Sequence, residues 1–115
     1  MNKIMHRNGD VLFEEDISLK QLVEKHKKNL SYADLSYADL SYADLSYADL
    51  SYADFSHTNL SHTNLIWVNF SHAVFRGANL TGANLTKANL TEADLSYANL
   101  RGANLRGTDL RWADF

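Results

Sequence analysis

The sequence predicts an all-β solenoid that follows a short N-terminal cap, and three observations lead to this fold class. Seventeen consecutive five-residue units run from Ser31 to Phe115 without insertion or deletion. Their pattern is small polar, variable, Ala, Asp or Asn, then Leu or Phe, and no Pro interrupts it. Residues 1–30 lack the period. Because a short fixed repeat stacks copies of one structural unit, residues 31–115 should form a solenoid.

A period of five residues fits neither a helix nor a straight strand. In an α-helix, the Leu of each repeat would advance by about 140° and the apolar residues would surround the cylinder. In a straight strand, the odd period would place successive Leu residues on opposite faces. The chain should therefore turn once in every repeat and form a coil with Leu and Ala inside.

The first 30 residues predict a hairpin and a short helix. Asn8 and Gly9 precede an apolar run, which is the signal for a hairpin with a type I′ turn. Ser18 and Gln21 have the spacing of a capping box, so a helix should begin between them. The first coil of a repeat array needs such a cover over its apolar end. We therefore expect an N-terminal cap at residues 1–30 and the repeat array at 31–115.

The repeat units SYADL, SHTNL, TGANL and RGANL resemble the pentapeptide-repeat family, whose consensus is Ala-Asp/Asn-Leu-X-X. The resemblance covers residues 31–115. It implies a right-handed quadrilateral β-helix in which four repeats form one coil, with the central Leu or Phe and the preceding Ala buried. Seventeen repeats would then make about four coils. Residues twenty apart would stack at the spacing of paired strands, ~4.8 Å.

The C-terminal repeats suggest a homodimer. The last repeat carries no predicted cover, and members of the family often associate through the C-terminal coil. The resemblance therefore implies a tail-to-tail dimer with these candidate contacts: Leu100, Leu105, Leu110, Trp112 and Phe115. A monomer with a frayed last coil and a chain truncated by cloning are the alternatives.

Composition limits the class of protein. The chain has no Cys, which excludes a disulfide framework and a thiolate metal site. No apolar run approaches the ~20 residues of a membrane span, and no apolar signal peptide is evident, so we expect a cytoplasmic protein that does not bind membranes.

The net charge of −3 is distributed unevenly along the array. Residues 31–75 carry five Asp and no Lys or Arg, whereas residues 76–115 carry five basic and four acidic side chains. Long acidic members of the family mimic duplex DNA, so an inhibitor or protector of DNA gyrase or another topoisomerase is the alternative function. A DNA mimic needs continuous charge, but Val74 interrupts the predicted Asp column. Nucleic-acid binding is not expected either, because the three C-terminal Arg residues should face different sides.

The sequence contains no motif that predicts catalysis or cofactor binding. His57, His62 and His72 could suggest a metal, but none of them has another His twenty residues away. His72 should instead form a surface hydrogen bond with Glu92. The many Ser and Thr side chains are expected to satisfy turns. We therefore expect a protein that is not an enzyme and has no cofactor, metal site or catalytic residue.

The remaining candidate site is a surface for a protein partner. The repeats depart most from the pattern near Leu65, where Ile66 replaces a small polar residue and Trp67 should face outward, one coil from Tyr47. Tyr47, Ile66 and Trp67 should form one apolar patch. We thus expect a non-enzymatic repeat scaffold, or protein–protein interaction module, whose partner the sequence does not identify.

Overall fold

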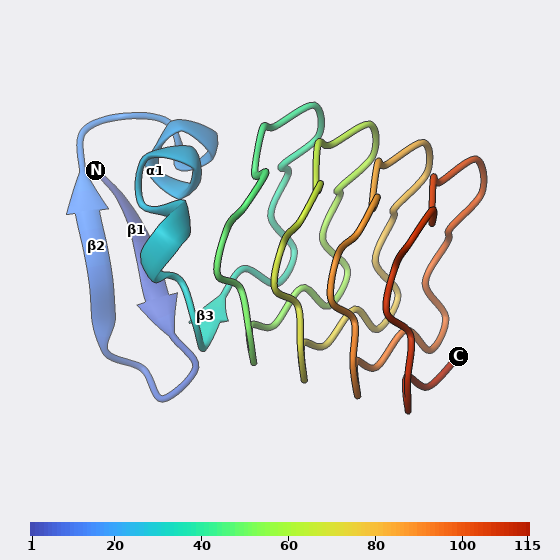
Figure 1. The fold of residues 1–115 in the computed structure, drawn as a ribbon. Helices are drawn as coiled ribbons and strands as arrows, with labels where there is room; N and C mark the ends of the chain where they lie inside the picture. The colour runs from blue at the N-terminus through green and yellow to red at the C-terminus, as the bar shows by residue number, and fades with distance from the viewer.

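A computed structural model describes all 115 residues and shows a small sheet and a helix at the N-terminal end of a regularly coiled chain (Figure 1). The N-terminal sheet has the strand order β2-β1-β3, and both pairings are antiparallel. The elements are β1 (Asn2–His6), β2 (Val11–Glu15), α1 (Leu19–Lys25), the 3₁₀ helix η1 (Lys27–Asn29) and β3 (Ala33–Asp34). Because β3 belongs to the first repeat, this sheet joins the cap to the array.

The predicted hairpin is present, but the predicted type I′ turn is wrong. A type I′ turn needs a positive φ at both central residues, and only Gly9 has one, at 100°. The Gly9 N–H donates to the His6 carbonyl at 2.9 Å, and the His6 N–H donates to the Asp10 carbonyl at 2.7 Å. These bonds close a three-residue loop in which Gly9 takes the left-handed position after the turn. The Asn8 side chain stabilises that loop by accepting the Asp10 N–H.

The predicted capping box begins α1. The Ser18 hydroxyl accepts the Gln21 N–H at 3.1 Å, and the Gln21 side chain accepts the Ser18 N–H at 3.0 Å. These two bonds satisfy backbone donors that the first helical turn leaves free. Leu22 and Val23 of this helix are fully buried, so α1 covers the apolar end of the coiled array.

Each repeat contains one tight turn, as the period of five predicts. In the first repeat the Ala33 N–H donates to the Leu30 carbonyl at 3.1 Å, and the same bond recurs in all later repeats through Ala113. The residue before the Ala has a positive φ, as for Tyr32 at 63°, whereas Ser31 does not. A positive φ at the third residue alone defines a type II turn. The seventeen repeats thus turn the chain by the same local geometry.

Successive coils pair through parallel bridges between residues twenty apart. Thirteen such bridges run from Asp34↔Asp54 to Asp94↔Asp114. At each bridge the following central residue also donates to the next coil, as the Leu35 N–H does to the Asp54 carbonyl at 2.8 Å. This main-chain pairing arranges equivalent repeats in columns along the axis in Figure 1. We use "column" below for side chains that are twenty residues apart.

The Leu, Phe and Ala side chains form one core inside the coil, as predicted. The core contains 27 buried residues, and Ile4, Leu22 and Val23 of the cap are among them. Phe55 and Phe75 stack with their ring centroids 5.1 Å apart. Phe70 meets Phe75 edge-on at 4.8 Å. Phe55 and Phe75 are twenty residues apart, so their stack confirms the predicted stacking at that spacing.

Contacts between cap and array begin before the first predicted repeat. Leu30 is fully buried, and its N–H donates to the Asp49 carbonyl, as a central Leu of the array does. The carboxylate of Glu24 in α1 accepts the Asp44 N–H at 2.9 Å, where a carbonyl of a preceding coil would otherwise accept. The cap therefore satisfies donors on the open edge of the first coil. The division at residues 30 and 31 stays a prediction.

Candidate partner surface

The second residue of each repeat supplies the outward side chains. All seventeen have a left-handed backbone, with Gly at four of them and thirteen other residues at φ values between 57° and 63°. Such a conformation costs an L-residue roughly 1–2 kcal/mol, so the type II turn and the pairing of neighbouring coils must outweigh that cost. The turn directs these side chains away from the core, and it places Tyr, His and Trp on the surface.

One column of these side chains forms a continuous stack that starts in the cap. The ring centroids of His6 and Tyr32 are 5.4 Å apart, those of Tyr32 and Tyr52 4.7 Å, and those of Tyr52 and His72 4.6 Å. The Nε2 atom of His72 then lies 3.0 Å from a Glu92 carboxylate oxygen. The expected pairing of His72 with Glu92 is thus present as a close contact between the ring and the carboxylate. The ring of His6 therefore adds a side-chain contact between the cap and the array.

In two further columns, a glycine follows a stacked histidine. Tyr37 stacks on His57, and Tyr42 stacks on His62, with ring centroids 5.0 Å apart in both pairs. A Cβ atom built on Gly77 would lie 2.8 Å from the His57 ring. The glycine of the next coil therefore leaves room for the histidine ring above it, and these histidines are held by stacking instead of facing one another as metal ligands.

The fourth column contains the sequence-predicted partner patch. Tyr47 and Trp67 are 56% and 53% exposed, and Ile66 is half-buried beside Trp67. The Tyr47 N–H donates to the Ile66 carbonyl at 2.9 Å, so the main chain fixes the relative positions of these neighbours. The structure thus places all three predicted residues on one side of the array. We call Tyr47, Ile66 and Trp67 the Trp67 surface.

Two lysines border the Trp67 surface, and the sequence analysis missed both. The Nζ atom of Lys28, in η1, lies 5.6 Å from the centroid of the Tyr47 ring. The Nζ atom of Lys87 lies 5.3 Å from the centroid of a Trp67 ring. A cation over an aromatic face is attracted by the ring quadrupole. The spacing of twenty between Trp67 and Lys87 was a signal that could have revealed the second contact.

The Asp or Asn side chain of a repeat accepts a hydrogen bond from the first residue of the next repeat. The Asp34 carboxylate accepts both the N–H and the hydroxyl of Ser36, at 3.1 and 2.6 Å, and most repeats contain the same arrangement. Hydrogen bonds from the Ser hydroxyl and N–H lower the pKa of Asp39, Asp44 and Asp94 in this way. The hydroxyls therefore stabilise turns, as predicted, and are not positioned as nucleophiles.

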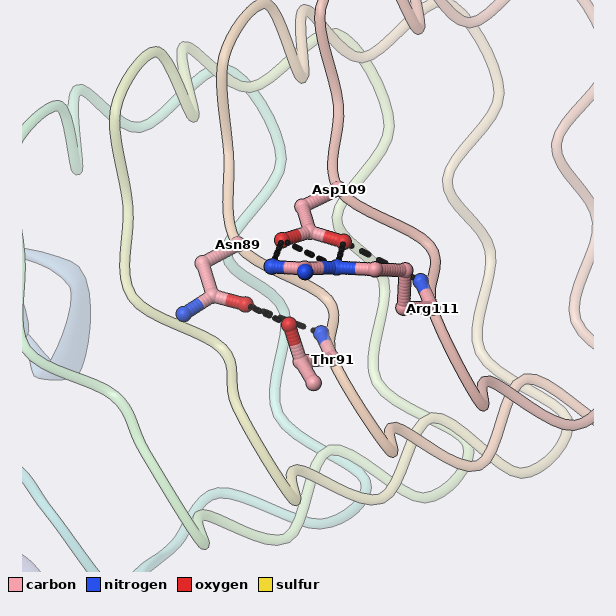
Figure 2. A network of polar contacts seen from close by, with 4 residues as sticks. All are labelled: Asn89, Thr91, Asp109 and Arg111. Atoms are coloured by element: carbon pink, nitrogen blue, oxygen red, sulfur yellow. Dashed lines mark hydrogen bonds and ion pairs between the residues drawn. The ribbon is translucent and has the colours of Figure 1, made fainter.

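Arg111 occupies the first position of the last repeat, where most other repeats have Ser or Thr. Figure 2 shows its guanidinium beside the Asp109 carboxylate, with hydrogen bonds between them. In the preceding coil, the Thr91 hydroxyl donates to the Asn89 side chain. Arg111 Nη2 donates to Asp109 Oδ2 at 2.6 Å and Nε donates to Oδ1 at 2.9 Å. The side-chain hydrogen bond from Arg111, with that from its N–H, lowers the pKa of Asp109 to about 2.

The predicted dimer contacts lie at the least covered part of the core. Leu100, Leu105 and Leu110 are only partly buried, and Trp112 and Phe115 are 73% and 71% exposed. The guanidinium of Arg111 lies 5.8 Å from the centroid of the Trp112 ring. These five residues form an apolar end surface, and its occupant stays a prediction.

The structure also bears on enzymatic, metal-binding, membrane and DNA-mimic functions. No pocket opens on it, and no group of three or more His, Asp or Glu side chains is close enough to hold a metal ion. No helix is long and apolar enough to cross a membrane. In the acidic column, Val74 pairs with Asp54 on one side and Asp94 on the other, which interrupts the run of carboxylates.

The geometry defines a repeat solenoid with stacked aromatic side chains on its exterior, and comparison with known proteins identifies its family. The family profile described as "Pentapeptide repeats" matches eight copies, over residues 29–65, 63–96 and 83–115. The chain therefore belongs to the pentapeptide-repeat family, whose members form right-handed β-helices. No curated protein sequence gives a significant match.

Two solved structures show the same fold at substantial identity. HetL, a pentapeptide repeat protein involved in heterocyst differentiation regulation from the cyanobacterium Nostoc sp. strain PCC 7120, is 45% identical with a TM-score of 0.70. That match covers 70% of this chain and 38% of HetL, so the chain spans little more than a third of that relative. The pentapeptide repeat protein alr5209 from Nostoc PCC 7120 is 35% identical with a TM-score of 0.56, over 78% of each chain.

Proposed function

We propose that the protein is a non-enzymatic repeat scaffold that binds another protein through the Trp67 surface. The matched family indicates no catalytic class, and every buried side-chain polar atom of the chain has a hydrogen-bond partner. The exterior is therefore the part of the molecule available for function. Its columns of outward side chains give a rigid surface on which single residues can be varied without altering the coil.

The exposure of Trp67 in the middle of its column supports this proposal most directly. Trp67 is 53% exposed although the next residue, Val68, is buried in the core. Trp and Tyr dominate the energetics of protein interfaces, because they bury a large area at little entropic cost. Ile66 extends the apolar area at a repeat position that holds Ser, Thr or Arg elsewhere. The Trp67 surface therefore combines a central aromatic anchor with an adjacent aliphatic side chain.

The same proposal includes a rod of about four quadrilateral coils, which would present the Trp67 surface near its middle. The bridges between residues twenty apart support four repeats per coil, because four five-residue units contain twenty residues. Trp67 would then lie in the second coil, with Tyr47 in the first and Lys87 in the third.

Affinity capture with matched variants tests the proposed function. The immobilised chain, Trp67→Gly and the control Tyr97→Gly would be exposed to an extract of the producing cells, and retained proteins quantified by mass spectrometry. Gly occupies the equivalent left-handed position in four repeats, so both variants should keep the fold, which circular dichroism would verify. We expect wild type and Tyr97→Gly to retain the same specific protein. Trp67→Gly should retain about tenfold less of it, or lower still. Equal retention by all three proteins would contradict the proposal.

A further inference from the structure

The two lysines beside the Trp67 surface have no anionic partner within the chain. None of the five ion pairs in the structure includes Lys28 or Lys87. Each instead lies near an exposed ring, at 5.6 Å from Tyr47 and 5.3 Å from Trp67. A carboxylate from another molecule could therefore approach either ammonium group without displacing an existing salt bridge.

The carboxylates on this side of the array are already occupied by hydrogen bonds. Asp49 accepts the N–H and the hydroxyl of Ser51, at 3.2 and 2.8 Å. Asp109 is held by the guanidinium of Arg111, as Figure 2 shows. Arg106, exposed and in the same set of repeats, has no side-chain partner in the structure and adds a further unpaired cation. Lys28, Lys87 and Arg106 outnumber Asp49 and Asp109 on this side, and Arg111 offsets the charge of Asp109, so the net charge offered to a partner is positive, although the chain as a whole is negative.

We propose that the partner of the Trp67 surface is an acidic segment of another protein, with an apolar side chain between two carboxylates. This inference rests on the function proposed above and specifies its ligand. The carboxylates pair with Lys28 and Lys87, and the apolar side chain packs on Trp67 and Ile66. Positive charge beside an apolar anchor favours a ligand of complementary pattern.

The rise per coil sets the approximate spacing of the two carboxylates. Lys28 precedes Tyr47 by about one coil, and Lys87 follows Trp67 by one coil, so the lysines are about three coil spacings apart. Three spacings of ~4.8 Å give roughly 14 Å, which an extended chain at ~3.3 Å per residue covers in about four residues. Because no pocket interrupts the surface, the segment lies extended along the array. The expected motif has acidic residues about four positions apart with an apolar residue between them.

Selection from a peptide library tests this inference on the full chain. A phage-displayed library of random 12-residue peptides would be selected on the wild-type protein. Enriched peptides would be synthesised with a fluorescent label, and their affinities measured by anisotropy. The same peptides would be titrated with Trp67→Gly, with Lys28→Glu/Lys87→Glu, and with a control that makes the same charge change elsewhere, Lys20→Glu/Arg101→Glu. Glu92 already occupies the left-handed position equivalent to Lys87, so the charge reversal should be compatible with the fold.

We expect enriched peptides with the acidic–apolar–acidic pattern. Their affinity should fall about tenfold or more in Lys28→Glu/Lys87→Glu and in Trp67→Gly, and less than about twofold in the control. Raising the salt concentration should weaken binding, since exposed ion pairs are screened over about 8 Å at physiological ionic strength.

The other outcomes separate this inference from the proposed function. Peptides that need Trp67 but lack acidic residues, or that bind the lysine variant equally well, would overturn the acidic ligand and leave the binding surface intact. Peptides insensitive to Trp67→Gly, or no enriched peptide at all, would overturn both proposals. A self-association lost in Trp67→Gly, detected by sedimentation, would identify a second copy of the chain as the occupant and also overturn the acidic segment.

Discussion

At the scale of single residues, position in a column does not by itself decide how much a side chain stabilises the fold. Phe75 and Phe115 occupy the same repeat position and lie in the same column, two coils apart. Phe75 is nevertheless fully buried, whereas Phe115 is 71% exposed. Phe75 contacts Phe55 and Phe70, whose rings lie 5.1 and 4.8 Å away. The neighbouring coils on both sides create this difference, because they cover Phe75 on each face.

Truncation of these two rings should therefore have unequal effects. Phe75→Ala removes a buried ring and leaves a cavity, so we expect it to lower the free energy of unfolding by roughly 3–5 kcal/mol. Phe115→Ala should cost less than about 1 kcal/mol, because most of that ring is already in water. Urea unfolding followed by circular dichroism would measure both values. Similar losses for the two variants would mean that Phe115 is covered in solution.

A pH titration tests the contact between Asp109 and Arg111. The hydrogen bonds from Arg111 hold the pKa of Asp109 at about 2, below its ordinary value of 3.8. A lowered folded-state pKa stabilises the fold above the unfolded value, and this contribution is lost as the pH falls from about 4 through 2. In Arg111→Ala the pKa of Asp109 should rise, while that of Asp94, held down chiefly by Ser96, should not change. NMR titration of the side-chain carboxyl carbons would show this, and an unchanged Asp109 midpoint would disprove the contact.

At the scale of the element, the type II turn determines what each outward position tolerates. All seventeen second residues are left-handed, but the space above them differs. A Cβ on Gly77 would lie 2.8 Å from the His57 ring, whereas a Cβ on Gly102 would meet nothing closer than the Gly82 nitrogen at 3.8 Å. Both turns thus share the left-handed backbone conformation, but only at Gly77 does a neighbouring ring exclude a side chain.

Alanine substitutions at these two glycines should separate the two effects. Gly102→Ala should cost about 1 kcal/mol, because an L-residue pays for its left-handed backbone there. Gly77→Ala should cost more, because the His57 ring must also leave its stack with Tyr37, which is worth about 0.5–1.5 kcal/mol. Thermal unfolding of both variants, with and without His57→Ala, would test this. The extra cost should vanish when the ring is removed, and its persistence would contradict the clash.

At the scale of the whole molecule, the two ends of the array differ in how their core is covered. The cap covers the first coil with α1, and it supplies hydrogen-bond acceptors such as the Glu24 carboxylate. At the other end, Leu100, Leu105 and Leu110 remain only partly buried. An exposed edge with an apolar surface favours association with another chain. The homodimer through the C-terminal coil follows from this contrast as a prediction.

Light scattering would measure that association. We expect a mass of about twice 13.0 kDa for the unmodified chain and a monomer for Leu110→Glu/Phe115→Glu, since charges on the end surface oppose its burial. Tyr37→Glu, which alters an exposed ring far from that end, should remain dimeric. A monomeric wild type would show that the end surface stays open. A dimer in all three proteins would move the contact to another surface.

How far the sequence predicts the molecule depends on the range of the interactions involved. The repeat of five residues determined the turn in every unit, the inward Leu and Ala, and the column that unites Phe55 with Phe75, because these follow from local periodicity repeated without interruption. The capping box of Ser18 was readable for the same reason, since its partners are three residues apart. The family also followed from the repeat. The candidate residues of the Trp67 surface came from a local departure from the pattern.

Only the tertiary structure decided which side chains meet between coils and between cap and array. Type I′ and three-residue loops share the Asn-Gly signal, so strand pairing had to select the loop. The left-handed second position was signalled by Gly in four repeats, but Tyr and His at the other sites concealed it. The positions of Lys28 over Tyr47 and of His57 over Gly77 depend on stacking of segments distant in sequence. A sequence period determines which residues share a column, whereas long flexible side chains settle their contacts only when neighbouring coils are in place.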